Sequence, residues 1–146
     1  MAKLAGRWLV VIIDDSNPTA RTVSGDVQSV DIPLEYDELD VTGFSDGTKN
    51  SIPGMPGVNL EITGKFNPTA NTGLFSVLVD IIGDYAGHTV TVQIGDNAAP
   101  TGGEPEFEGE YWLSKMTVSG SPSGAVEITG SFRVWGNSLP AWGTVA

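Results

Sequence analysis

Apolar and polar positions alternate along most of the chain, and Gly, Pro, Asn and Asp interrupt the alternation at short intervals. This period-two pattern is typical of short strands joined by turns. It is clearest in residues 58–66, which read VNLEITGKF, with Val58, Leu60, Ile62, Gly64 and Phe66 as the expected inward positions. We therefore predict an all-β protein in which 58–66 is a half-buried strand.

The same pattern predicts strands elsewhere, at 22–30, 32–41, 88–94, 107–118 and 126–134. In the first two, the positions expected to be buried are Val27, Val30, Ile32, Leu34, Leu39 and Val41. Residues 7–13 form a continuous apolar run, RWLVVII, which indicates a strand buried on both faces.

One segment has helical rather than strand spacing. In residues 71–82 the apolar side chains recur at the spacing of a single helical face, namely at Leu74, Val77, Leu78, Ile81 and Ile82. Asn71 or Thr72 could cap the start, and Gly83 is a natural stop. We expect one short helix packed on a sheet.

Two segments and the end of the chain lack sustained alternation. Residues 44–57 and 95–106 are rich in Gly and Pro and predict long loops, which are usually functional or interaction elements. Residues 135–146 form a tail that holds Trp135 and Trp142. With 146 residues, the chain is expected to be a single domain.

The sequence also contains an internal echo. Residues 61–66 read EITGKF and residues 127–132 read EITGSF. The two strands are either structural equivalents in a pseudo-twofold arrangement or two half-buried strands that converge on similar residues.

Composition narrows the classes of function. Eighteen acidic and seven basic residues give a formal charge of −11, which opposes tight binding to nucleic acid. The same charge would keep a passing duplex from adhering to a negatively lined passage. The absence of cysteine excludes disulfides and thiolate sites. No apolar run is long enough to span a bilayer, and no signal peptide is expected.

Catalytic chemistry has little support. His88 follows Asp84 and Tyr85, but no nucleophile accompanies them, so we expect a surface histidine and no enzyme. A single histidine without cysteine argues against a transition-metal site, and no acidic spacing matches an EF-hand. Alternate acidic positions, Glu104, Glu106, Glu108 and Glu110, share one strand face and indicate a solvated acidic face or a stripe lining a lumen.

Aromatic residues raise an alternative from another class. Trp8, Trp112, Trp135 and Trp142, together with paired acids, could suggest a small carbohydrate-binding or host-attachment module. The four are spread along the sequence, which favours core or subunit-contact roles.

Residues 26–54 carry a more specific signal and read DVQSVDIPLEYDELDVTGFSDGTKNSIPG. This segment resembles the N-terminal part of siphophage tail-tube and related virion proteins. The likeness extends more loosely through GKFNP at 64–68, the segment around Gly73 and Leu74, and the strand ending at Trp135. The chain departs from that pattern in being short and in its tryptophan-containing tail.

The resemblance implies a β-sandwich, spanning 1–146, with one short flanking helix. It further implies hexameric rings of identical copies, stacked into a tube through which the genome passes, within a virion assembled in the bacterial cytoplasm. The expected partners are other copies and other virion proteins, without cofactor, metal, membrane or specific nucleic-acid binding. Candidate contacts between copies lie in the first loop, at Thr48, Lys49, Asn50, Ile52 and Met55. The alternative within the class is a capsid decoration protein on the outer head surface.

Overall fold

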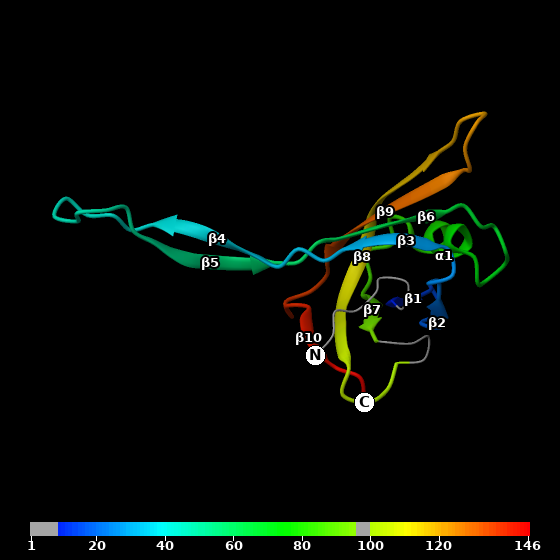
Figure 1. Ribbon diagram of the computed structural model, residues 1–146, viewed down its shortest axis with the longest axis horizontal. Coiled ribbons are helices and arrows are strands. Elements are labelled where there is room, and N and C mark those ends of the chain that lie inside the picture. Colours follow the sequence, from blue (N-terminus) through cyan, green and yellow to red (C-terminus); the bar gives the residue numbers. More distant parts are fainter. Residues whose placement is uncertain (1–8, 96–99) are drawn as a thin grey trace.

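The computed structural model describes residues 9–95 and 100–146. Within these residues the elements are β1 Leu9–Asp14, β2 Ala20–Thr22, β3 Val27–Asp31, β4 Glu35–Asp40, β5 Ser51–Gly57, β6 Leu60–Lys65, α1 Leu74–Ile81, β7 His88–Ile94, β8 Pro105–Ser119, β9 Glu127–Val134 and β10 Ala141–Thr144. The predicted all-β fold with one short helix is therefore confirmed (Figure 1).

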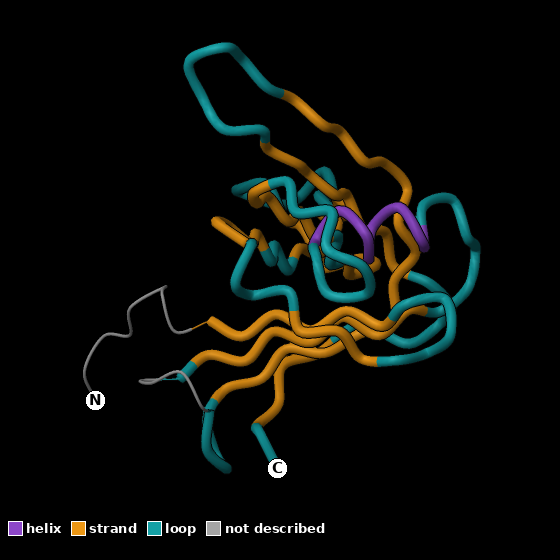
Figure 2. Tube along the Cα trace, turned by 90° about the vertical axis from the view of Figure 1, so that its right-hand side faces the viewer, coloured by secondary structure: helices purple, strands orange, loops and turns teal. Residues whose placement is uncertain are grey.

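One large antiparallel sheet has the order β2-β1-β7-β8-β9-β6-β3, and β10 is added beside β8. The 15-residue strand β8 links its two halves. The first part of β8 pairs with β7 and β10, whereas the part after Tyr111 pairs with β9 alone. A register shift between Leu113 and Lys115 lies close to this change of partner. The expected sandwich is thus formed by two halves of one sheet (Figure 2).

Both halves and the helix contribute to one hydrophobic core. Its members are Val11, Ile13, Val23, Val58, Leu60, Ile62, Leu74, Val77, Leu78, Ile81, Val90, Val92, Phe107, Tyr111, Leu113, Ile128 and Phe132. Alternate residues of β6 are buried, as the pattern of 58–66 predicts. In β1 only Val11 and Ile13 are buried, so the expectation of burial on both faces is wrong for its described residues.

Helix α1 begins later than the sequence predicts. Its N-cap is Gly73, which makes no side-chain cap, so the prediction of Asn71 or Thr72 is wrong. The carboxylate of Asp26, which precedes β3, instead accepts a hydrogen bond of 3.1 Å from the Leu74 amide. The helix stops as expected at Gly83, which has a φ of 73° that glycine adopts readily.

The echoed segments are neighbouring strands. In the β6–β9 ladder Thr63 faces Thr129, while Ile62 faces Gly130 and Gly64 faces Ile128, so each isoleucine lies opposite a glycine. An added Cβ would lie 2.7 Å from Leu74 at Gly64 and 3.2 Å from Leu78 at Gly130. The repeat is thus symmetric about the threonine pair, and both glycines make room for the helix.

Two predicted loops and the tail are corrected by the structure. Residues 44–57 are not all loop, because 51–57 form β5, which pairs with β4 and leaves 41–50 as the connection. Pro105 and Glu106, placed in the loop 95–106, belong to β8, and residues 96–99 lie outside the described residues. The tail 135–146 contains strand β10, which pairs with the start of β8.

Candidate assembly surfaces

Strands β4 and β5 form a two-stranded hairpin that extends away from the main sheet (Figure 1). We call residues 35–57 the arm. Every residue of β4 is exposed, and β5 pairs only with β4 among the described strands. An isolated two-stranded hairpin is at best marginally stable in water, so an extended one is expected to find a partner.

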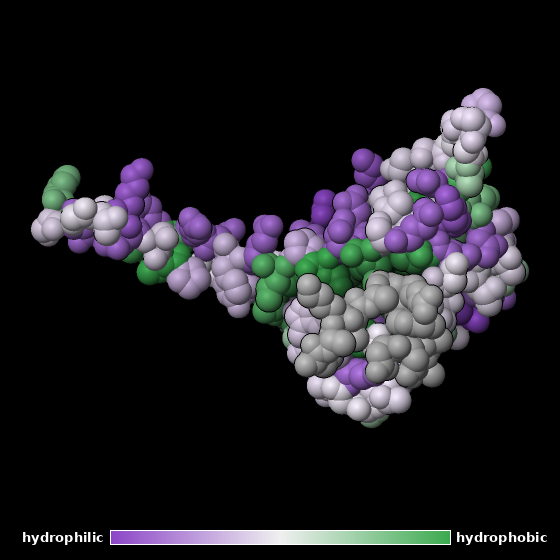
Figure 3. Space-filling model, viewed as in Figure 1, coloured by the Kyte–Doolittle hydropathy of each residue, from purple (hydrophilic) through white to green (hydrophobic). Residues whose placement is uncertain are grey.

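The outer part of the arm has one apolar face. Leu39 faces Ile52 across the ladder, and Val41 follows Leu39 on the same side, with Asp37 and Glu35 nearer the base. The opposite face carries Tyr36, which faces Pro56, and the carboxylates of Glu38 and Asp40. Figure 3 shows hydrophobic residues emerging along the arm.

The apolar face is uncovered in the single chain. Leu39, Val41 and Ile52 are 48 to 50% exposed. Leu34, which precedes β4, and Tyr36, on the opposite face, are 48% and 53% exposed. The prediction that Leu34, Leu39 and Val41 are buried is therefore wrong for the isolated subunit. Apolar and polar residues do alternate in this segment, but no other part of the described chain covers the apolar ones.

The tip of the arm, residues 42–50, is held by local hydrogen bonds. Asp40 accepts a bond of 2.9 Å from the Thr42 amide, and Asp46 accepts one of 2.7 Å from the Gly43 amide. These amide donors lower the pKa of both carboxyl groups. Phe44 projects from this ordered tip and is fully exposed.

The candidate contact residues are distributed along the arm. Thr48, Lys49 and Asn50 lie at the tip, and Ile52 lies on the apolar face. Met55 lies near the base and is 77% exposed. Leu39, which faces Ile52 on the apolar face, was predicted as a core position rather than as a contact residue.

The base of the arm is fixed to the core. The buried hydroxyl of Tyr111 donates a hydrogen bond of 2.7 Å to the carbonyl of Val58. Burial raises the pKa of Tyr111, so this hydroxyl keeps its proton. The next residue, Asn59, accepts a bond of 3.4 Å from the Val134 amide. The arm therefore leaves the domain from a defined position.

A second surface lies on the face of β7 and β8 that points away from the core. Glu106, Glu108 and Glu110 accept hydrogen bonds from Gln93, Thr91 and Thr89, at 2.7, 3.4 and 2.7 Å respectively. Glu104 lies just before β8 and accepts a bond of 3.0 Å from the Thr101 amide. Glu106, Glu108 and Glu110 thus follow one side of the sheet, and with Glu104, which lies in the turn before the strand rather than on its face as predicted, we call them the acidic face.

Asp14, at the end of β1, extends the acidic face. Its pKa is raised by burial and next by repulsion from Glu110. The carboxylates of this face therefore lie close enough together for Glu110 to raise the pKa of Asp14.

His88 is buried rather than exposed, which corrects the prediction. Its Nε2 lies 3.2 Å from Oδ2 of Asp84. No group of three or more metal-binding side chains occurs among residues 9–95 and 100–146. In the same ranges, no helix is long and apolar enough to cross a membrane.

The fold brings together two tryptophans that are far apart in sequence. The ring of Tyr85 lies 5.7 Å from that of Trp112 and 6.4 Å from that of Trp135. Trp142 packs edge-on against Phe107 at 5.3 Å, and Trp8 lies outside the described residues. Trp142 covers Phe107 but is itself 45% exposed. In the Tyr85 cluster Tyr85 is exposed, and the two tryptophans are half-buried.

No protein-family model matches the sequence, and no curated protein matches it. Solved structures do match. A chain of the SPP1 tail tube superposes with a TM-score of 0.75 at 14% identity, covering 98% of this chain and 80% of that one. A chain from the tail of an empty gene transfer agent particle gives 0.68 at 16% identity, covering 99% and 100%. This chain has the tail-tube fold.

The tail-tube fold also occurs in a contractile injection system. A chain of the PVC sheath–tube complex in its extended state gives a TM-score of 0.67 at 15% identity, covering 98% of this chain and 93% of that one. Within this tail-tube fold, the motif at 26–54 corresponds to β3, β4, the tip and the first half of β5. The segment that carried the resemblance is therefore largely the arm.

Proposed function

We propose that this chain is the tail-tube subunit of a phage virion, and that its copies form hexameric rings stacked into a tube for the genome. The observation that carries the proposal is the arm, whose apolar face is exposed in the single chain. An exposed apolar face of this extent marks a protein–protein contact. The tail-tube fold supports the same conclusion, and the gene transfer agent tail is described with C6 symmetry.

Free sheet edges supply the contacts within a ring. Strand β2 pairs only with β1, and β10 pairs only with β8, among the described strands. Each therefore presents a row of unpaired backbone groups, which favour pairing with another chain. Joining β10 of one copy to β2 of the next is a heterologous contact, and such contacts close into rings.

The acidic face is the surface that we assign to the lumen. It lies on the half-sheet bounded by β2 and β10, so closing the ring through these edges would continue it from copy to copy. A negative lining repels phosphates and lets a duplex slide. The chain acts in this proposal as a structural protein, without catalysis or cofactor.

Two other functions compete with this one. A capsid decoration protein needs no lumen, so it does not explain an acidic face bounded by two open edges. A carbohydrate-binding module would use the Tyr85, Trp112 and Trp135 cluster, but it would leave the arm unexplained. The arm and the acidic face together favour the tube.

Electron microscopy of the purified protein at high concentration, combined with mass measurement by light scattering, tests the proposal. Rings or tubes with a central hole are expected, with a mass of about six copies per ring. A monomer or trimer that forms no rings, and binds only to heads, would support capsid decoration instead. Binding in a glycan screen through the Tyr85 cluster would support the carbohydrate alternative.

A further inference from the structure

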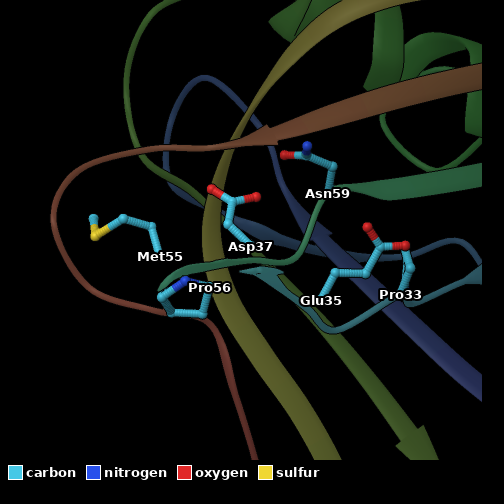
Figure 4. A pocket seen from close by; sticks show the side chains of 7 residues that line it. Pro33, Glu35, Asp37, Met55, Pro56 and Asn59 are labelled. Carbon is cyan, nitrogen blue, oxygen red and sulfur yellow. The ribbon is translucent and has the colours of Figure 1, made fainter. Parts of the chain in front are cut away.

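The base of the arm is acidic, whereas its tip carries one lysine, Lys49, together with Asp46. Lys49 projects at the tip, and in the described chain it takes part in no ion pair. At the base, a cleft of about 290 Å³ carries the carboxylates of Glu35 and Asp37 (Figure 4). The remaining lining residues are Pro33, Met55, Pro56, Gly57 and Asn59. We call this cleft the root cleft.

Neither carboxylate of the root cleft has a partner within the described residues. No hydrogen bond or ion pair there involves the side chain of Glu35 or Asp37. Two exposed carboxylates on a proline-lined wall form a cation-accepting surface of low conformational freedom. A lysine ammonium is a compact charge that suits such a site.

The tip of one copy cannot reach its own root cleft. The ladder from Glu35–Gly57 to Asp40–Ser51 keeps the arm extended. At ~3.3 Å per residue, its six-residue strand separates tip from base by roughly 20 Å. Complementary groups on opposite ends of one rigid element can therefore meet only between copies, in a head-to-tail contact that repeats.

We propose that the tip of each arm seats on the root cleft of a second copy in the adjacent ring, with Lys49 between Glu35 and Asp37 of that copy. This inference rests on the proposed tube and names the surface that receives the arm. The contact is heterologous, so it propagates along an axis without closing.

A neighbouring cleft provides the apolar part of the contact. It has a volume of about 510 Å³, shares Met55, Pro56, Gly57 and Asn59 with the root cleft, and is also lined by Val134 and Leu139. Phe44, at the same tip as Lys49, is the large apolar side chain that this cleft would cover. Burying this ring would remove apolar surface from water, and it would add to an exposed charge pair that contributes little by itself.

The absence of cysteine makes the contact directly measurable, because an engineered pair has no background. The variant Thr48→Cys/Met55→Cys should form a ladder of oxidised oligomers when the protein assembles. The control Thr48→Cys/Ser123→Cys places the second thiol in the exposed β8–β9 turn and should form no ladder.

Charge exchange provides the second readout. Lys49→Glu should raise the critical concentration for tube formation roughly tenfold, because three carboxylates then meet. Lys49→Glu combined with Glu35→Lys and Asp37→Lys should restore assembly. Lys115→Glu makes the same charge change at another exposed lysine and should have no such effect.

The outcomes separate this inference from the function on which it rests. Wild-type tubes, a 48–55 ladder and rescue by charge exchange support both. Wild-type tubes without the ladder, together with an unaffected Lys49→Glu variant, overturn the root-cleft contact and leave the tube intact. A wild-type protein that forms neither rings nor tubes overturns both.

Discussion

Tyr111 and Val58 join the core to the base of the arm, through a 2.7 Å hydrogen bond from the phenolic hydroxyl to the backbone carbonyl. Tyr111 lies in β8 at the point where this strand exchanges partners, and Val58 directly follows β5. Both residues are fully buried. The bond therefore links the direction of the arm to the packing of the two half-sheets.

Removing this hydroxyl should weaken the subunit. Tyr111→Phe leaves a buried carbonyl without its donor, and we expect a loss of about 1 to 3 kcal/mol in the free energy of unfolding, measured with urea. Tyr36→Phe removes an exposed hydroxyl from the arm and should change stability little. Equal stability of the two variants would show that the Tyr111 bond contributes nothing to the fold.

Removing the apolar face of the arm should stop assembly without unfolding the domain. Leu39→Ser/Ile52→Ser removes a cross-strand pair that is exposed in the single chain, so the stability loss should stay below about 1 kcal/mol. Light scattering should then report a monomer where the wild type forms rings. Val118→Ser, at a similarly exposed position far from the arm, should assemble normally.

Reversing charge on the acidic face should make tubes retain DNA. Glu106→Lys/Glu108→Lys places cations where the proposal puts the lumen, and these attract phosphates. Co-sedimentation at low salt should recover duplex DNA with the variant tubes but not with wild-type tubes. Glu61→Lys, on the outward face of the other half-sheet, is the control. If the Glu61→Lys control retained DNA and the double variant did not, the lumen would be lined by the Glu61 face and our assignment of the acidic face would be wrong.

Asp14 should destabilise the subunit at neutral pH. Its raised pKa means that folding favours the protonated form, and the stability from this preference is lost as pH rises through that pKa. Asp14→Asn should therefore raise the melting temperature near neutral pH, and the gain should shrink at about pH 3. A gain that does not depend on pH would point to packing rather than charge.

Asp15, the residue next to Asp14, provides a control in which the effect of pH on stability has the opposite sign. The Thr19 amide, followed by Arg21, lowers the pKa of Asp15. A lowered pKa contributes stability above the unfolded value, and that contribution is lost as pH falls through the folded value. Asp15→Asn should therefore lower the melting temperature near neutral pH and have less effect in acid.

The glycines of the echoed strands should resist substitution. In Gly64→Ala the new methyl group would collide with the backbone carbonyl of Asp26 and with Leu74, which should cost about 1 to 3 kcal/mol. Gly57→Ala, in another strand, meets nothing within 4 Å and is the control. Calorimetry of the two variants decides whether the Gly64 contact is as close as described.

Local pattern predicted much of the fold, because the buried faces of β6 and β9 follow strict alternation. It missed β5 because Pro53 and Pro56 are atypical of strands. In a two-stranded ribbon each strand has a free edge, so a residue without an amide hydrogen is tolerated there. The local pattern also misplaced the helix cap. The Leu74 amide is capped by Asp26, which is distant in sequence and comes close only in the folded chain.

The candidate site was predicted in part for a related reason. The sequence pointed to the arm as a candidate contact segment, but it assigned Leu39 to the core, because alternation identifies an apolar face without saying what covers it. Only the tertiary structure shows whether the apolar face packs against the rest of the same chain or is left free for another copy. The acidic face was predicted more fully, since period two alone fixes which glutamates point the same way.

The uncovered apolar face of the arm also gives the assembly a temperature dependence. Burial of apolar surface is driven by the entropy of water near room temperature and weakens on cooling. Subunits joined mainly through such a face should polymerise on warming and shed from the ends of the filament in the cold, while each domain remains folded.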